Sequence, residues 1–168
     1  MSSNELIVGG TTTSNSESWV LKLDSDLNLI WENYYGYFGS ADLNSVLADK
    51  NNGILLAGST SRASWLAKIN LDGNIIWQKT YGGSDIDYCL SFIQNQTGNI
   101  ILGNTSSSSN GDVGGNKGEL DYWIVKLESE TSSLENYTIA HYSEPNFSTS
   151  NSPINIFDST SPHPTFKV

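Results

Sequence analysis

Short apolar runs, separated by turns rich in Gly, Asn, Ser and Asp, recur three times along this chain. The clearest set lies in the middle, where four such segments occupy Asn44–Asp49, Ile54–Thr60, Trp65–Asn70 and Asn74–Tyr81. Runs of this length bounded by turn residues are typical of β-strands. The pair Asp72-Gly73 tolerates the positive φ angles of a tight turn, so the last two strands are expected to form a hairpin.

The same pattern occurs on either side of this middle set. Three stretches run from an apolar segment through a polar turn to the motif Trp-x-x-Lys-Leu/Ile: Leu6–Trp31, Ile54–Trp77 and Ile100–Leu127. A period of about 46 residues is typical of a four-stranded propeller blade or a similar stacked β unit. The sequence therefore predicts an all-β fold of about three four-stranded propeller-like blades.

The two outer copies are less complete than the middle one. The first copy begins with its second strand, near Glu5–Thr12, and the last strand of the third copy, Leu134–His141, is degenerate. The other strands of the third copy are expected near Tyr88–Gln94, Asn99–Thr105 and Tyr122–Leu127. Closed propellers typically have about four to eight blades, so this chain would form an incomplete propeller. It would then oligomerise, stack as an open array, or expose large apolar patches at its ends.

The second strand of each copy is apolar without alternation, as in Leu6-Ile7-Val8, Ile54–Ala57 and Ile100–Leu102. A strand with one face in water should alternate between apolar and polar residues, so a continuous run predicts that both faces are covered. The sheets are therefore expected to stack on one another.

The chain divides into a β-repeat domain at 1–141 and an arm at 142–168. The arm holds all four prolines, Pro145, Pro153, Pro162 and Pro164, among Ser, Thr and Asn. Proline disfavours both helix and central strand, so the sequence predicts an extended arm. The arm would supply the missing first strand of the first blade or reach another subunit, and a disordered tail is the alternative.

Every tryptophan falls at a repeated position. They lie in the third strand of each copy and in the fourth strand of two copies: Trp19, Trp65 and Trp123, then Trp31 and Trp77. Regular placement predicts a packing role, because each repeat needs the same large apolar filler. The alternative is an aromatic platform for sugar rings.

Lysines recur three residues after the third-strand tryptophans, at Lys22, Lys68 and Lys126. Ion pairs with acids of the first strands, such as Asp42 and Asp87, are expected for them rather than substrate binding.

The composition narrows the classes of partner. The 168 residues carry a formal net charge of -10, which would repel the phosphates of nucleic acid. No apolar span approaches the roughly 20 residues of a membrane helix, and Met1–Glu5 shows no Sec signal peptide. The single cysteine, Cys89, lies in an apolar run and is expected to be buried.

No set of residues in the sequence suggests catalysis. Only His141 and His163 are available for acid–base chemistry, and neither belongs to a recognisable constellation. The protein is therefore expected not to be an enzyme, with no catalytic, cofactor-binding or metal-binding residues and no cofactor. A pair of carboxylates for glycoside hydrolysis stays open, because it needs no fixed spacing in the sequence.

One loop departs from the repeat. The segment Ser106–Asp121 is longer than its counterparts and holds the oxygen-bearing side chains of Asp112, Asn116, Glu119 and Asp121. Such ligands on a glycine-rich loop suit Ca²⁺, but the spacing matches no EF-hand. A solvated acidic loop is the favoured interpretation.

Two stretches carry a family resemblance. Ser64–Ser84 resembles the propeller-type repeats found in arrays in surface and secreted proteins of Bacteroidetes-type bacteria, and Asn110–Asn116 followed by Asp121-Tyr122-Trp123 is similar to a longer version of them. The resemblance covers about Glu5–Glu128. It implies a β-propeller-like fold with an adhesive or structural role, and it brings no catalytic residues.

These observations predict a non-enzymatic structural or attachment module that forms homo-oligomers on an exposed surface. A capsid, spike or fibre protein of a phage virion is one such context, and a cell surface or the extracellular space is another. Its expected partner is itself or another structural protein, with no nucleic acid and no membrane insertion. The alternative function is a carbohydrate-binding adhesin module that recognises a cell-surface glycan and is supported by calcium.

Overall fold

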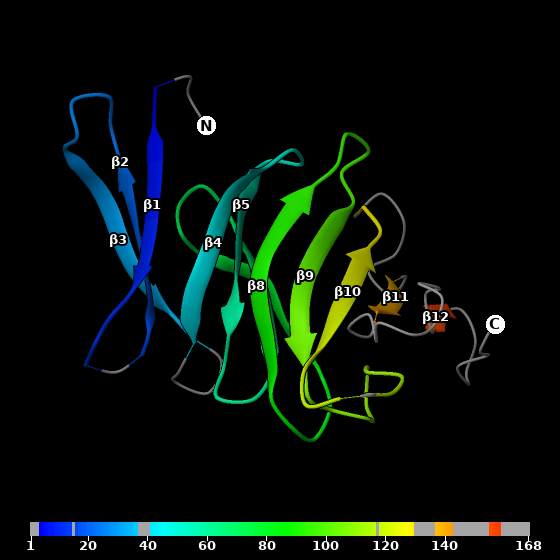
Figure 1. Ribbon diagram of the computed structural model, residues 1–168. Helices are drawn as coiled ribbons and strands as arrows, with labels where there is room; N and C mark the ends of the chain where they lie inside the picture. The colour runs from blue at the N-terminus through cyan, green and yellow to red at the C-terminus, as the bar shows by residue number, and fades with distance from the viewer. Residues whose placement is uncertain are drawn as a thin grey trace.

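The chain folds into β-strands joined by turns (Figure 1). The computed structural model describes residues 4–14, 16–36, 41–116 and 118–129, together with the backbone of two later strands, Tyr137–Tyr142 and Asn155–Asp158. No helix occurs among these residues, so none of them forms a helix long and apolar enough to cross a membrane. The all-β fold class is confirmed.

The strands form three antiparallel sheets. The first sheet contains β1 (Leu6–Thr11), β2 (Ser18–Leu23) and β3 (Leu29–Tyr35). The middle sheet contains β4 (Asp42–Asp49), β5 (Gly53–Ser59), β6 (Ser64–Ile69) and β7 (Ile75–Tyr81). The third sheet contains β8 (Asp87–Gln94), β9 (Ile100–Ser106), β10 (Asp121–Leu127), β11 (Tyr137–Tyr142) and β12 (Asn155–Asp158).

The predicted strands of the middle copy agree with β4 to β7 to within two residues at each end. The predicted hairpin is also present, because β6 pairs with β7 and Gly73 between them has a φ of 85°. Local turn chemistry and apolar runs were sufficient to predict these four strands, since each strand is short and its turn residues are unambiguous.

Strand pairing repeats in the same register in all three sheets. The third-strand tryptophan lies opposite Gly10 in the first sheet, Gly58 in the middle sheet and Asn104 in the third. This register defines equivalent positions: Leu6, Ile54 and Ile100 correspond to one another, as do Trp19, Trp65 and Trp123. The repeat in the sequence is thus a repeat in space.

The sheets stack side by side, with the first at the left of Figure 1, the middle one at the centre and the third at the right. One core cluster lies between the first and middle sheets and includes Val20, Tyr35, Ile54, Leu56, Trp65 and Ile69. A second lies between the middle and third sheets and includes Leu55, Leu66, Cys89, Leu102, Trp123 and Val125. Every residue of β5 and β6 is buried, because the middle sheet has a neighbour on each side.

The prediction that both faces of every sheet are covered was correct only for the middle sheet. On β1, Leu6 is 47% exposed and Val8 is 46% exposed, whereas the equivalent residues Ile54 and Leu56 are both 0% exposed. The reason is positional, since no described strand lies on the outer side of the first sheet. An identical apolar pattern is therefore buried in one copy and exposed in another.

Hydrogen bonds at the edges fix how one sheet sits on the next. Leu71 of the middle sheet's last turn offers its carbonyl oxygen to Trp31 Nε1 at 3.0 Å and to Lys22 Nζ at 3.2 Å. Tyr35 donates its hydroxyl to the Gly73 carbonyl oxygen at 2.7 Å. These bonds satisfy polar atoms that the stacking would otherwise bury without partners.

A backbone contact recurs at both interfaces. The N–H of Leu43 donates to Thr11 Oγ1 at 2.9 Å, and the N–H of Cys89 donates to Ser59 Oγ at 3.1 Å. Thr11 and Ser59 hold equivalent positions, as do Leu43 and Cys89. The two interfaces are therefore built on one plan.

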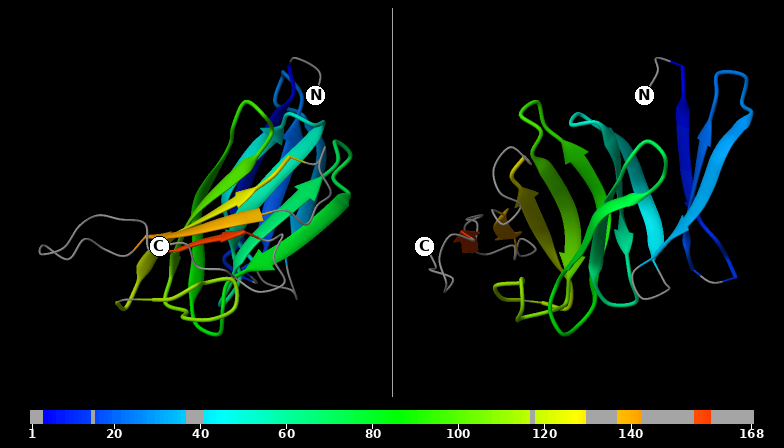
Figure 2. Two further views of the ribbon diagram at one scale, coloured as in Figure 1. Left: turned by 90° about the vertical axis from the view of Figure 1, so that its right-hand side faces the viewer. Right: turned by 180° about the vertical axis from the view of Figure 1, so that it is seen from behind.

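Part of the arm extends the third sheet. β12 pairs antiparallel with β11, with Ile139 opposite Phe157 (Figure 2). The described strand of the arm, β12, does not supply a first strand to the first sheet, which was one of its two expected places, because β1 lies at the edge of the three described strands of that sheet. The rest of the 142–168 segment, with its four prolines and His163, lies outside the described residues.

The repeated lysines do pair with acids, and the partner of Lys68 lies in a first strand, β4, as predicted, but the two named candidates are not the partners. Lys68 pairs with Asp49 at 2.6 Å, Lys22 with Glu5 at 3.2 Å and Lys126 with Glu128 at 2.6 Å. The prediction of Asp42 and Asp87 as partners was wrong. These residues begin β4 and β8, whereas each lysine lies near the other end of its sheet. Strand order alone did not specify which end of a strand each lysine reaches.

The Lys68–Asp49 pair is the most buried of the three, with side chains 3% and 2% exposed. Burial raises the pKa of Asp49, but hydrogen bonds from Lys68 and Gln94 lower it more, so its pKa lies below the ordinary value. A carboxyl with a lowered pKa in the folded state stabilises the fold above its unfolded pKa of about 4. That contribution is lost as the pH falls through the lowered value.

Replacing Lys68 with Met should therefore destabilise the protein strongly, because it leaves Asp49 buried without its cation. A loss of roughly 3–5 kcal/mol is expected in urea unfolding at pH 7. Lys126→Met is the matched control, since it changes the equivalent lysine of a pair whose side chains are 40% and 35% exposed. It should cost no more than about 1 kcal/mol. Equal losses for the two variants would contradict this assignment.

Candidate functional site

The described residues hold no group of three or more His, Cys, Asp or Glu side chains placed to bind a metal ion. Cys89 is fully buried, as predicted, and burial raises the pKa of its thiol to about 12. A thiol of that pKa stays protonated at neutral pH and is a poor nucleophile. The side chain of His141 and the whole of His163 lie outside the described residues.

The long third loop is tied to the chain that precedes β8. Asp112 accepts a hydrogen bond from the Gly82 N–H at 3.1 Å, and its own N–H donates to the Gly82 carbonyl oxygen at 3.0 Å. Asn110 Oδ1 accepts from the Ser84 N–H at 2.8 Å. Val113 from the same loop is buried in the core between the middle and third sheets. The loop therefore braces the fold.

A buried carboxylate anchors the start of this loop. Both Asp87 oxygens accept hydrogen bonds, one from Ser106 Oγ and the other from Ser108 Oγ at 2.8 Å and the Gly83 N–H at 2.7 Å. The serine hydroxyls donate to Asp87, so this Ser–Asp cluster holds the start of the loop against the beginning of β8.

The structure does not gather the four candidate calcium ligands. Asp112 is engaged with Gly82, and Asn116 bonds the Ser106 carbonyl oxygen through its Nδ2 and the Gly118 N–H through its Oδ1. Glu119 is exposed, whereas Asp121 is buried. Their oxygen atoms thus serve separate structural contacts or point into solvent.

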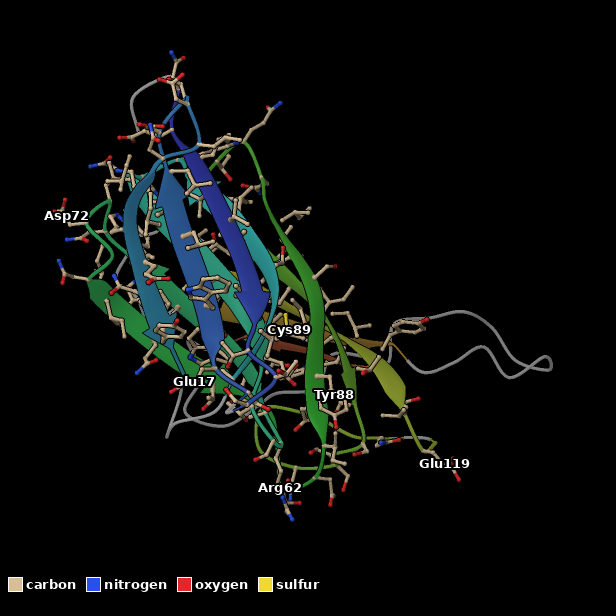
Figure 3. All side chains as sticks on the ribbon, turned by 90° about the vertical axis from the view of Figure 1, so that its left-hand side faces the viewer. Glu17, Arg62, Asp72, Tyr88, Cys89 and Glu119 are labelled. Carbon is tan, nitrogen blue, oxygen red and sulfur yellow. The ribbon has the colours of Figure 1, made fainter. Side chains whose placement is uncertain are left out.

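Large apolar side chains are exposed on both end faces of the described stack of sheets. The outer face of the first sheet is here called the first-sheet face. Its apolar residues include Leu6, Val8, Trp19, Leu21, Ile30 and Tyr34. Figure 3 looks onto this face, and no described strand lies over β1, β2 and β3. Large contiguous apolar surfaces of this kind mark interaction sites in soluble proteins.

An aromatic pair lies on this face where β2 begins and β3 ends. The rings of Trp19 and Tyr34 stack with centroids 6.2 Å apart and planes 9° apart. Trp19 Nε1 donates to Glu32 at 3.0 Å, which fixes the indole plane. The equivalent Trp65 Nε1 donates to Gln78 at 3.3 Å, but Trp65 is fully buried by the first sheet. Trp19 is therefore a core residue without its covering sheet.

The opposite end of the stack is the outer face of the third sheet, here called the third-sheet face. Its large exposed residues are Tyr88, Leu90, Ile93 and Tyr122, and Figure 3 shows Tyr88 on β8, away from the first sheet. A hollow of about 450 Å³ lies on this face, lined by residues that include Leu90, Gly103, Tyr122 and Ile124. A volume in this range admits a bulky side chain or a small ligand.

The sequence predicted that an incomplete propeller would expose apolar patches at its ends, but it did not specify which residues line them. The signal was present in the unbroken apolar runs of β1 and β9, which are the same at the ends of the stack as in its middle. Only the stacking order of the sheets reveals which of these apolar strands have a face without a neighbouring sheet.

The comparisons with known proteins give no further guidance. No model of a known protein family matches the chain, and no curated protein matches it significantly.

The equivalent tryptophans allow a direct test of this picture. Trp65→Ala should cost roughly 3–5 kcal/mol of stability, because it opens a cavity in the core. Trp19→Ala should cost about 1–2 kcal/mol, because part of the indole is already in water. Urea unfolding followed by far-UV circular dichroism measures both. The measurement is made on dilute single chains, before any assembly covers Trp19, and a Trp19 variant as unstable there as the Trp65 variant would contradict this picture.

Proposed function

We propose that this protein is a non-enzymatic structural or attachment module whose sheets act as propeller-like blades and whose copies assemble through their end faces. The observation that carries the proposal is the pair of uncovered apolar faces at the two ends of the stack. In the interior of the same chain, the equivalent residues Ile54, Leu56 and Trp65 are fully buried.

Energetics support assembly over an isolated monomer. Burying one Leu or Val side chain is worth about 1.5–3 kcal/mol, and each face presents several such residues. The net charge of -10 would oppose association at long range, but salt screens it over about 10 Å. Burial acts at contact, where the apolar faces meet, and is therefore the stronger effect.

The context proposed for such assembly is an exposed surface, either a virion or a cell. The described residues offer polar side chains that support the fold, such as Asp87 and Asp112, rather than a preorganised catalytic set. The resemblance to adhesive or structural repeat proteins points in the same direction. Fold alone does not specify function, so the assembly itself is the property to test.

Light scattering coupled to size exclusion tests the proposal. We expect a mass of at least twice the 18.3 kDa of one chain at micromolar concentration, with dissociation on dilution. High salt should strengthen the assembly, because it screens like charges and favours apolar burial. A protein that stays at the mass of one chain at all concentrations would refute the proposal.

A second candidate function is carbohydrate binding at the first-sheet face. The stacked Trp19–Tyr34 pair beside Glu32 favours it, because a flat aromatic surface with an adjacent acceptor suits a sugar ring. This candidate needs no calcium from the third loop, whose described side chains do not converge on a site.

A glycan array distinguishes the second candidate. Wild-type protein should bind a defined set of glycans, and Tyr34→Ala should abolish that binding, with a chelator making no difference. Tyr88→Ala is the control, because it removes an exposed tyrosine from the opposite face. Absence of glycan binding, or equal binding by both variants, would contradict carbohydrate recognition at this face.

A further inference from the structure

We propose that copies of this chain associate head to tail, with Trp19 of one copy seated in the hollow beside Gly103 on the third-sheet face of the next. The inference rests on the proposed assembly and names its partner, a second copy, and its geometry. It follows from the two sheet interfaces that the chain already contains.

The third-strand tryptophan has the same role in both interior interfaces. Trp65 packs in the cluster shared with the first sheet, and Trp123 packs in the cluster shared with the middle sheet. In both cases the tryptophan fills the interface with the sheet that precedes it in the chain. Trp19 holds the same register position, opposite Gly10, but its sheet has no predecessor. The first-sheet face is therefore the tryptophan-bearing half of an interface.

The third-sheet face has the same positions as the surface that receives a tryptophan inside the chain. Ala57 and Leu66 of the middle sheet belong to the cluster that contains Trp123. The positions of Ala57 and Leu66 are occupied in the third sheet by Gly103 and Ile124, which line the hollow. The third-sheet face is thus the receiving half of the same interface, and its hollow lies where a following tryptophan would enter.

The side chains of the two faces also match in size. Across the interface between the middle and third sheets, Ser64 Oγ donates to Asn104 Oδ1 at 3.1 Å. The position of Ser64 is held by Tyr122 on the third-sheet face, and the position of Asn104 is held by Gly10 on the first-sheet face. A Cβ added at Gly10 would meet no atom within 4 Å. The large Tyr122 would therefore face open space above Gly10.

The two faces also carry opposite charges at matching positions. Lys22 reaches across its interface to the Leu71 carbonyl oxygen in the next sheet's last turn. The equivalent lysine on the third-sheet face is Lys126, and the equivalent turn of the first sheet is Asp24–Asn28. That turn carries a half-buried Asp24 and an exposed Asp26. A lysine would thus meet an acidic turn, which is a favourable contact.

A contact between two different faces repeats from copy to copy. It closes into a ring if the rotation between copies returns to the start, and otherwise it forms a filament. A contact of one face with an identical face would instead stop at a dimer. The two arrangements can be separated by variants that block one face each.

The test uses Trp19→Arg to block the first-sheet face and Gly103→Arg to block the third-sheet face. Gly103 tolerates a side chain, because an added Cβ would approach nothing closer than Ser91 Oγ at 3.7 Å. Ile76→Arg is the control, since Ile76 is 53% exposed on β7 of the middle sheet. Circular dichroism checks that each variant is folded, and Tyr34→Arg replaces Trp19→Arg if that variant is not.

Sedimentation gives the readout. Each blocked variant alone should sediment as a single chain, the control should assemble like wild type, and an equimolar mixture of the two blocked variants should form a dimer of twice the chain mass. The mixture recovers a dimer because each partner retains one intact, complementary face. A mixture that stays monomeric, or a blocked variant that still assembles alone, would overturn the head-to-tail inference. Wild-type protein that is itself monomeric would instead refute the proposed function.

Discussion

The stacking of one apolar sheet face on the next is the interaction on which the rest of this structure depends. The middle sheet shows it in full, because both faces of β5 and β6 are buried and the fully buried Trp65 and Leu66 point to opposite neighbours. Each side chain of that size contributes about 1.5–3 kcal/mol when it leaves water. An exposed ion pair contributes at most about 1 kcal/mol, so burial sets the architecture.

Polar groups then decide how the sheets are aligned. Lys22, Trp31 and Tyr35 all donate to carbonyl oxygens of the turn that joins β6 to β7. Apolar stacking is weakly directional, whereas these bonds have fixed geometry and would leave unsatisfied buried atoms in any other alignment. The repeat in the sequence therefore specifies both the attraction between sheets and their relative position.

A repeat that stacks in this way creates its own interaction surfaces. Each unit needs a neighbour on both sides, so a stack that does not close leaves one uncovered face at each end. Here those faces retain residues of core type, such as Val8 and Trp19 at one end and Leu90 and Tyr122 at the other. The feature that stabilises the interior is thus the same feature that favours assembly, and no separate binding motif is required.

The sequence by itself determined the strands, their turns and the repeat, because these depend on local propensity and on apolar runs that are short and clearly bounded. It also determined that Cys89, Trp65 and Trp123 serve packing in the interior. It did not determine that β12 joins β11, that Lys68 pairs with Asp49, or that the long third loop braces the fold through Asp112. Those contacts join residues whose proximity follows from the stacking of sheets. The tertiary structure alone decided which copies of one apolar pattern are buried and which face outward, because burial depends on whether a neighbouring sheet is present and not on the residues themselves.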